Sequence, residues 1–554
     1  MDCINNHSGL GDPLSSTPDQ SQSETPTTTT MGRDVIVRDK SEFSLLLDLP
    51  PGIQSKIFTY LQAHDITHLT RANSYINNTL KNDDSMARAW YRRFAPSHQK
   101  LIKTIVTGKD KDELQKWLKR FTKDEALVKS VMDRHESIYF PALFFFTLTK
   151  LMSECKTFKV ETKATLLVNS WNYPDSFSPD GQHVLSDIDD KTLKIHGQKG
   201  DGSWKEETTI FHENSVNSAT FSIDSRYIVT TSDHKKTAKI YGKQDDGAWA
   251  EKATIFYDYP IVSISFSSDS RHLVTLSDDY KVKIHSQKDD GSWAEKATIS
   301  DDARILSITL SANGRYLVTA ALDGKAKIYG KQDDGSWIEK AIIYHDKYVC
   351  LASFSADDRS VVTFSRDPKM KIHGLEANGS WVEKATISPN KAVNTATISA
   401  DNRHLVISDK NARAIIYGKK DDGSWEEKVI ISHKYWVNPP TLSPDSRCVI
   451  TCGGDKKVKI YGQKDNGSWE EKATITHGSH VRSTILSVDG RHVLTASDDK
   501  KVKIYGQQTD GSWEEKATIS YNSEILSATF SDDGHVLTIH HDKTVKIIEL
   551  RMDG

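Results

Sequence analysis

A short acidic phrase that ends in tryptophan recurs along the chain, and its residue types could bind a cation or a sugar. One copy is DDGSW, Asp289 to Trp293. Aspartate oxygens suit calcium, and an indole face suits a glycan. A hard cation, however, takes about six to eight oxygen ligands, and the phrase offers too few. We therefore expect each copy to be a hairpin whose tryptophan packs over the edge of a sheet, with calcium or glycan binding as the alternatives.

No catalytic motif accompanies these turns. The sequence lacks a GxxxxGK or GxGxxG phosphate loop, an HExxH zinc motif and a GxSxG nucleophile elbow. Its 21 histidines fall mostly in repeated positions or variable connections. The cysteines are scattered without CxxC spacing, which argues against a zinc site or a disulfide framework and favours a reducing compartment; they are Cys3, Cys155, Cys350, Cys448 and Cys452. We expect a binding protein and not an enzyme, with no cofactor and no metal ion.

Charge and hydropathy give no sign of nucleic acid or membrane as a partner. A net charge of -3 with 27% charged residues shows no bias toward polyanions. The densest apolar run, Phe140 to Met152, is shorter than the roughly 20 residues that a membrane helix needs. We predict a buried helix there that begins at Pro141, and no signal peptide. Residues 1–40 are rich in Ser, Thr, Pro and Gln, so we predict a disordered tail.

The tryptophans of the acidic phrase mark a regular repeat. One gap between them is 45 residues and six are 44, at Trp204, Trp249, Trp293, Trp337, Trp381, Trp425, Trp469 and Trp513. Each unit contains an FSxDxR run, an apolar alternation, a polar turn, a KVKI-like alternation, the acidic phrase and an EKATI-like run. Alternation with a period of two indicates strands, and Asp-Gly between strands indicates a hairpin. Four short strands in such a period are typical of a β-propeller blade.

Residues 161–550 resemble the WD-repeat family. The resemblance rests on the FSPDGR-like turn at Phe177 to Gln182, the Ser-x-Asp at Ser277 to Asp279, and the KVKIYG third strand. The Trp-Asp pair of the family is replaced by Tyr-Gly or His-Gly. Because only some units carry a counterpart of the tetrad histidine of the family, we expect partial hydrogen-bonded tetrads at His212, His345, His433 and His477.

Nine FSxDxR equivalents predict nine blades, with eight as the alternative. The run Glu161 to Leu167 precedes the first full unit, whereas the last unit ends at Lys543 to Leu550 without a fourth strand. We predict that these two segments pair and close the ring, because closure removes both open sheet edges. Residues 551–554 form a short tail.

The connection from each EKATI-like run to the next FS run varies, while the rest of the unit is nearly constant. In WD propellers these connections lie on one face, around the channel mouth. Aromatic and arginine side chains usually dominate interface energy. We therefore predict that a target protein binds at Tyr257, Tyr259, Arg304, Lys347, Tyr348, Lys434, Tyr435, Trp436, His480 and Arg482. Chance drift in exposed loops is the alternative.

Phosphate recognition on that face is a separate hypothesis. In propellers that read phosphate, arginines cluster on the channel face. The arginines at irregular positions of the repeats are Arg304, Arg366, Arg413 and Arg482.

Residues 41–95 change to a helical period, with apolar residues at helical spacing from Ile53 to Leu61 and from Ile66 to Leu80. The segment resembles an F-box in its Leu-Pro start, its IxxxIFxYL pattern and its late Trp90. That resemblance implies a Skp-type adaptor as partner, bound through Leu49, Pro50, Ile53, Ile57, Phe58, Leu61, Ile66 and Leu69. Packing of this face on a helical linker, predicted for residues 96–160, is the alternative.

An F-box, a helical spacer and a WD propeller in series are the layout of substrate receptors in ubiquitin ligases. We therefore predict a non-catalytic substrate-recognition subunit of an SCF-type E3 ubiquitin ligase. Its partners would be the Skp-type adaptor, through it a cullin-based ligase, and an unknown target protein. We expect a cytoplasmic location, with the nucleus or a eukaryotic host cell as alternatives. A WD-repeat scaffold unrelated to ubiquitin and a glycan-binding propeller are the alternative functions.

Overall fold

The computed structural model describes residues 85–552, except 168–176, 190, 200–202, 233–235, 245–246, 268, 289, 356, 368, 390–392, 465, 509–510 and 532–533. The described residues all belong to one compact unit of the chain, Phe58–Gly554. The predicted adaptor-binding residues and the predicted disordered tail lie outside the described residues.

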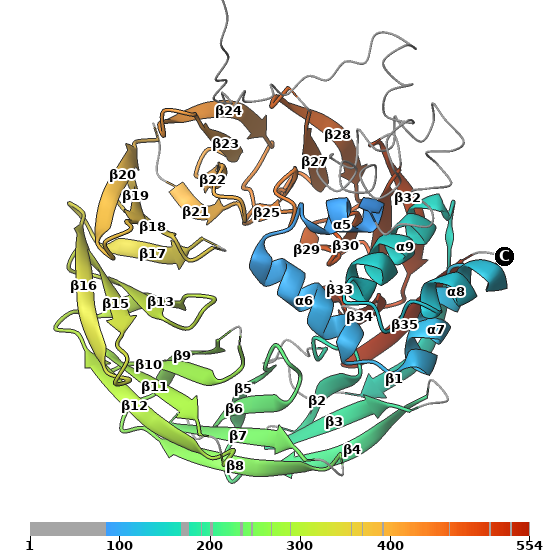
Figure 1. Cartoon of the computed structure of the whole chain (residues 1–554), viewed down its shortest axis with the longest axis horizontal. Coiled ribbons are helices and arrows are strands. Elements are labelled where there is room, and N and C mark those ends of the chain that lie inside the picture. Colours follow the sequence, from blue (N-terminus) through green and yellow to red (C-terminus); the bar gives the residue numbers. More distant parts are fainter. Residues whose placement is uncertain are drawn as a thin grey trace, which may run out of the picture. The chain divides into compact units, whose positions relative to one another are not determined.

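Nine antiparallel sheets form a closed ring, which confirms the prediction of nine blades (Figure 1). Eight sheets have four strands, and the first has three plus an isolated bridge between Phe177 and Val184. The innermost strands are β5 (Val216–Phe221), β9 (Ile261–Phe266), β13 (Ile305–Leu310), β17 (Val349–Phe354), β21 (Val393–Ile398), β25 (Thr441–Leu442), β29 (Val481–Leu486) and β33 (Ile525–Phe530).

The other strands follow outward in each blade. The second strands are β2 (His183–Asp189), β6 (Tyr227–Ser232), β10 (His272–Ser277), β14 (Tyr316–Ala321), β18 (Ser360–Ser365), β22 (His404–Asp409), β26 (Cys448–Cys452), β30 (His492–Ser497) and β34 (His535–His540). The third strands are β3 (Thr192–Gln198), β7 (Thr237–Lys243), β11 (Lys281–Gln287), β15 (Lys325–Lys331), β19 (Met370–Leu375), β23 (Arg413–Lys419), β27 (Lys457–Gln463), β31 (Lys501–Gln507) and β35 (Thr544–Met552). The outer strands are β4 (Trp204–Phe211), β8 (Trp249–Phe256), β12 (Trp293–Ser300), β16 (Trp337–Tyr344), β20 (Trp381–Ile387), β24 (Trp425–Ser432), β28 (Trp469–Thr476), β32 (Trp513–Ser520) and β1 (Phe158–Leu167).

The first strand of the chain closes the ring. β1 pairs antiparallel with β35, from Phe158 opposite Met552 to Leu167 opposite Thr544. This pairing makes β1 the outer strand of the ninth blade. The predicted exchange of strands between the two ends of the propeller is confirmed.

The tryptophan of the acidic phrase packs between blades. The Trp381 ring lies edge-on against Tyr316 of the preceding blade, with centroids 5.5 Å apart, and Trp293 meets Tyr227 in the same way. Six of these eight tryptophans are only 7–9% exposed, at Trp204, Trp249, Trp293, Trp381, Trp469 and Trp513. Their indole faces are therefore part of the scaffold and are not open to stack on a glycan.

The FSxDxR turns also join neighbouring blades. The backbone N–H of Asp224 donates to Ser270 Oγ of the next blade, 3.1 Å away. Ser270 has φ 58°, a left-handed conformation that turns its side chain back toward the preceding turn. An equivalent hydrogen bond runs from the backbone N–H of Asp180 to Ser225 Oγ, 3.0 Å away. The residues repeated in each turn therefore form contacts between blades.

Connections of the propeller fall on two faces. We call the side with the FSxDxR turns and the acidic hairpins the turn face. We call the opposite side the loop face; it carries the connections between second and third strands and those from an outer strand to the next inner strand. Antiparallel pairing places these two sets of connections at opposite ends of the strands.

Five helices precede the propeller among the described residues and share a hydrophobic core with its eighth and ninth blades. They are α5 (Ser85–Tyr91), α6 (Pro96–Thr107), α7 (Lys111–Lys119), α8 (Glu125–Met132) and α9 (Phe140–Glu154). Asp110 and Asp124 cap α7 and α8 through their carboxylates. The predicted buried helix is confirmed as α9, with Pro141 in its first turn. None of the helices in the described ranges is long and apolar enough to cross a membrane.

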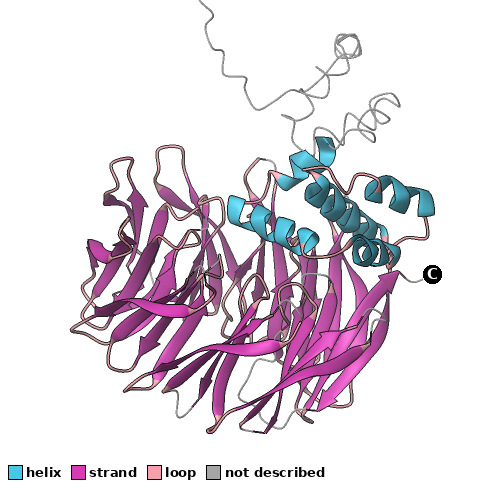
Figure 2. Cartoon of the chain, turned by 60° about the horizontal axis from the view of Figure 1, so that its bottom comes forward, coloured by secondary structure: helices cyan, strands magenta, loops and turns pink. Residues whose placement is uncertain are grey.

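The helices lie on the turn face, as Figure 2 shows from the side. Arg93 pairs with Asp445 at 3.1 Å, in the turn of the seventh blade. A ring nitrogen of His98 lies 2.7 Å from the Val488 carbonyl, in the eighth. Lys109 donates to the Asp180 carbonyl at 2.9 Å, in the first. The loop face is therefore left uncovered by the helices.

Candidate protein-interaction surface

The structure brings most of the predicted target-binding residues to the surface of the loop face. Tyr259, Tyr435 and Trp436 are 53%, 49% and 58% exposed. Tyr348 and His480 are half-buried, and the exposed charged residues are Arg304, Lys347, Lys434 and Arg482. These residues come from connections of five different blades and so surround the centre of the ring.

Tyr257 is the exception, because it is buried at 7% exposure. Its hydroxyl hydrogen-bonds the Thr275 hydroxyl at 2.7 Å, and burial raises the pKa of Tyr257 to about 12. In another blade, His345 holds Thr363 in the same way at 2.8 Å. Tyr257 therefore replaces the tetrad histidine inside its blade, and its predicted place on the open face is corrected.

Three of the four expected tetrad histidines make such hydrogen bonds, whereas neither ring nitrogen of His212 has a hydrogen-bond partner among the described residues, so the prediction is wrong at that position. His433 bonds Thr451 and Asp455, each at 2.9 Å. His477 bonds Thr495 at 2.8 Å and Asp499 at 3.1 Å. These buried groups hold the connections of the loop face in place.

Two variable positions of each blade meet on the loop face. The first position lies three residues after the tetrad position, directly before the inner segment. The second position follows the second strand of the same blade. In six blades the backbone N–H of the second position donates to the carbonyl of the first at 2.9–3.1 Å. We call these the rim pairs: Pro260 and Asp278, Arg304 and Leu322, Tyr348 and Arg366, Trp436 and Gly454, His480 and Asp498, and Glu524 and His541.

Side chains within several rim pairs complement each other. Arg366 donates to the Tyr348 hydroxyl at 2.9 Å and lies over its ring at 5.9 Å. Glu524 lies 3.6 Å from a ring nitrogen of His541. His480 Nδ1 lies 3.9 Å from Asp498, which also pairs with Arg482 at 2.6 Å. In these three blades the two positions of a rim pair are therefore joined by side chains as well as by backbone.

The pair of Trp436 and Gly454 forms an aromatic shelf. A Cβ atom at Gly454 would come within 2.8–2.9 Å of three indole atoms of Trp436, so the ring lies directly on the glycine backbone. The His480 ring flanks the indole, with centroids 5.7 Å apart. Tyr435 lies next to it at 6.3 Å, with Lys434 Nζ 5.6 Å from the Tyr435 centroid. We define the aromatic shelf as Tyr435, Trp436 and His480.

Two adjacent glycines make room for this arrangement. A Cβ at Gly453 would approach the His433 ring to 2.6–2.9 Å. Other blades carry larger residues at the place of Gly454, for example Asp278, Arg366 or Asp498. Comparison of the turns after the second strands would have identified Gly454 from the sequence.

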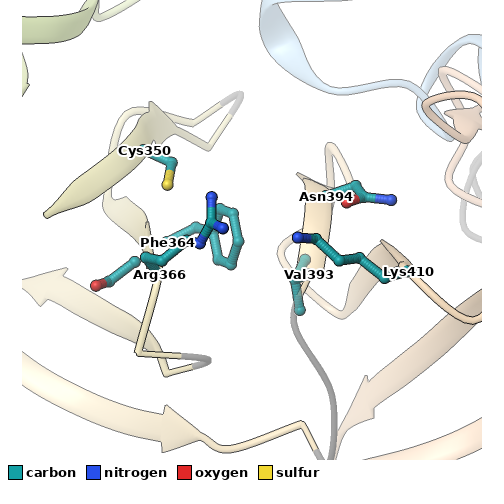
Figure 3. Close-up of a pocket in the computed structure, with 7 residues that line it drawn as sticks. Cys350, Phe364, Arg366, Val393, Asn394 and Lys410 are labelled. Carbon is teal, nitrogen blue, oxygen red and sulfur yellow. The ribbon is translucent and has the colours of Figure 1, made fainter. Parts of the chain in front are cut away.

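A second feature is a pocket between the fifth and sixth blades, shown in Figure 3. It has a volume of about 180 Å³ and is lined by Cys350, Phe364, Ser365, Arg366, Val393, Asn394 and Lys410. The side chains of Arg366 and Lys410 extend toward each other across it. We call this pocket the basic notch. Arg366 was one of the irregular arginines of the sequence, whereas Lys410 was not predicted.

The thiol at the notch is not activated. Burial raises the pKa of Cys350, against the opposing effect of the Arg366 charge. Among the described residues, no group of three or more His, Cys, Asp or Glu side chains is placed to hold a metal ion. The chemistry of this face is therefore that of hydrogen bonds, charges and aromatic contacts.

Comparison with known proteins supports the repeat assignment. Five segments match the family "WD domain, G-beta repeat", at residues 204–241, 252–286, 295–330, 427–462 and 469–506. The crystal structure of Saccharomyces cerevisiae Sqt1 is similar at 14% sequence identity and a TM-score of 0.47, over 61% of this chain and 96% of that one. No curated protein matches the sequence. Five segments of the propeller therefore match WD40 repeats.

Proposed function

We propose that this nine-bladed WD40-repeat propeller is the target-binding part of a substrate receptor in an SCF-type E3 ubiquitin ligase. WD40 propellers generally act as non-catalytic scaffolds for protein interactions. The observation that carries the proposal is the placement of the helices on the turn face, opposite the rim pairs. Such a chain has one face for its target and a separate end for a ligase.

The proposed binding of a Skp-type adaptor rests on the F-box-like sequence. Its late tryptophan, Trp90, is 2% exposed and packs on Phe94 and Phe146 with centroids 4.8 and 6.0 Å apart. The end of the F-box-like segment, α5, is therefore part of the core that α9 shares with the propeller. This continuity supports a rigid connection from the end of the F-box-like segment to the target-binding face.

The proposed action is proximity. A target held on the loop face would have its lysines near the ubiquitin-charged enzyme, and a bound pair reacts at a high effective concentration. No catalytic side chain of this chain is needed for that action. The rigid helical connection would fix the distance between target and ligase.

The test is co-elution of the full chain with a purified Skp-type adaptor in size-exclusion chromatography. We expect a stable complex that is lost when Ile57→Asp and Phe58→Asp are combined. A matched control is Ile138→Asp, because Ile138 is 83% exposed in the helical region. No co-elution, or a complex unaffected by the double change, would leave a scaffold unrelated to ubiquitin as the better assignment.

A further inference from the structure

We propose that the loop face from the fifth to the eighth blade binds an acidic, extended segment of the target protein. An anionic group of that segment would occupy the basic notch, and a large apolar side chain would lie on the aromatic shelf. The anionic group is a carboxylate or a phosphoryl group, since both carry oxygens that arginine and lysine bind. This proposal rests on the proposed function and names the kind of target that it would recognise.

Binding of an anionic group is inferred from the two cationic side chains of the basic notch, Arg366 and Lys410. Arg366 donates to the Tyr348 hydroxyl, and within the part of the chain that the structure describes neither Arg366 nor Lys410 is paired with a carboxylate. The nearby Asp409 is occupied by Arg413 at 2.6 Å. Two cations that face each other across a pocket repel, so an anion placed between them would be favoured.

The size of the notch suits one ionised group. Its volume of about 180 Å³ is several times the roughly 30 Å³ that one water occupies in the liquid. A carboxylate or phosphoryl group with a few waters therefore fits, whereas a folded element does not. Phe364 and Val393 form apolar walls that lower the local dielectric and strengthen the interaction.

Binding of a large apolar side chain is inferred from the aromatic shelf. Trp436 is 58% exposed although one face of its ring rests on Gly454. A ring held in place on one side loses little conformational entropy when a ligand covers the other side. An apolar side chain is favoured over a cationic one, because Lys434 lies beside the shelf, whereas the charge of Arg482 is paired with Asp498.

The two features belong to one ligand because they lie in neighbouring sectors of the same face. The notch is formed by the fifth and sixth blades, and the shelf by the seventh and eighth. Lys347 and Lys434 are exposed on the same stretch of connections, and Asp346 beside Lys347 is paired with Lys369 at 2.6 Å. Complementary charge and an exposed aromatic anchor together specify an acidic segment with one large apolar residue.

The experiment selects random displayed peptides on the immobilised full chain and measures the best peptide by fluorescence anisotropy. We expect enrichment of Asp or Glu together with an aromatic or large aliphatic residue. Arg366→Gln with Lys410→Gln, and separately Trp436→Ala, should each weaken the affinity at least about tenfold. Gly454→Asp should weaken it as Trp436→Ala does, because the new side chain displaces the indole.

Matched controls separate charge from position. Arg271→Gln with Arg315→Gln removes two exposed arginines of the turn face and should leave the affinity unchanged. Unchanged melting temperatures would show that every variant is folded. Selected peptides without an acidic preference, no enrichment at all, or notch and shelf variants that bind the peptide as tightly as the unchanged chain would overturn the proposal.

Further arms identify the source of the anionic group. The selected peptide is remade with phosphoserine in place of its acidic residue, and inorganic phosphate is used as a competitor. Tighter binding of the phosphopeptide would assign the notch to phosphoryl groups, and tighter binding of the original peptide to carboxylates. Adaptor co-elution measured on the same preparation keeps the two proposals apart, because either result can hold without the other.

Discussion

The buried ammonium group of Lys516 donates a hydrogen bond to the backbone carbonyl of Ser153, 3.2 Å away. Ser153 lies in the last turn of α9, where carbonyl groups lack partners within the helix. Lys516 belongs to β32 and is 1% exposed. The EKATI-like run of the eighth blade therefore caps a helix that precedes the propeller. This contact joins the helices to the blade that carries His480 of the aromatic shelf.

Replacement of Lys516 by methionine should loosen this junction. The carbonyls at the end of α9 would lose a charged donor, and an unpaired buried carbonyl costs about 1–3 kcal/mol. We expect faster hydrogen–deuterium exchange in α9, measured by mass spectrometry. The control is Lys472→Met, at the same place in the seventh blade, where the side chain is half-buried and pairs with Glu470. Equal protection of α9 in both variants would contradict the role of Lys516.

Closure of the ring can be tested by a designed disulfide. Lys159 and Arg551 are directly opposite each other in the pairing of β1 with β35. Cysteines at both positions should form an intramolecular bond on mild oxidation, because opposed residues of antiparallel strands lie within the reach of a disulfide. The bond is detected as a mobility shift in non-reducing electrophoresis. Only intermolecular species, or no bond, would contradict closure by β1.

The packing of Trp381 between two blades predicts that its removal strongly lowers the stability of the fold. Trp381 is 7% exposed and packs on Tyr316, so Trp381→Ala should cost about 3–5 kcal/mol of unfolding free energy. Trp436→Ala should cost less than about 1 kcal/mol, because most of that ring is already in contact with water. Thermal melts followed by circular dichroism compare the two. Similar losses of melting temperature would show that the acidic phrase is not scaffold.

Buried histidines predict a loss of stability in mild acid. Burial lowers the pKa of His285 and of His373 to about 4, from an ordinary value of 6.5. Between pH 6.5 and 4 the unfolded chain therefore takes up protons that the folded chain does not, and stability falls as the pH falls. Tyr241 and Tyr329 occupy the same place in other blades. His285→Tyr combined with His373→Tyr should thus raise the melting temperature more at pH 4.5 than at pH 7.5, and an equal shift at both values would contradict this cause.

Much of the fold could be predicted from the sequence because the repeat is nearly uniform. The tryptophan spacing revealed the repeat, the nine FSxDxR equivalents predicted nine blades, and the unpartnered segment Glu161 to Leu167 predicted the closure. The place of Tyr257 could not be predicted from its position in a variable connection. A tyrosine hydroxyl can satisfy the buried Thr275 as a histidine does in other blades, and only packing shows this.

The candidate site could be predicted only in part. Trp436 and His480 were expected on the loop face and lie there, Trp436 at 58% exposure and His480 half-buried. Gly454 was missed because a glycine in a turn is ordinarily read as backbone freedom, whereas here it makes room for an indole. Lys516 was missed because other blades also have a lysine at this position. Its burial depends on helices that are far away in the sequence.

The most direct test of the proposed receptor is proximity labelling in a eukaryotic cell, with a biotin ligase fused to the full chain. The account predicts that a Skp-type adaptor and a cullin are labelled, and that Ile57→Asp with Phe58→Asp abolishes both signals. The combination of Arg366→Gln, Lys410→Gln and Trp436→Ala should keep those signals and lose a separate set of target proteins. Absence of the adaptor and the cullin from the labelled proteins of a well-expressed, folded chain would contradict the account.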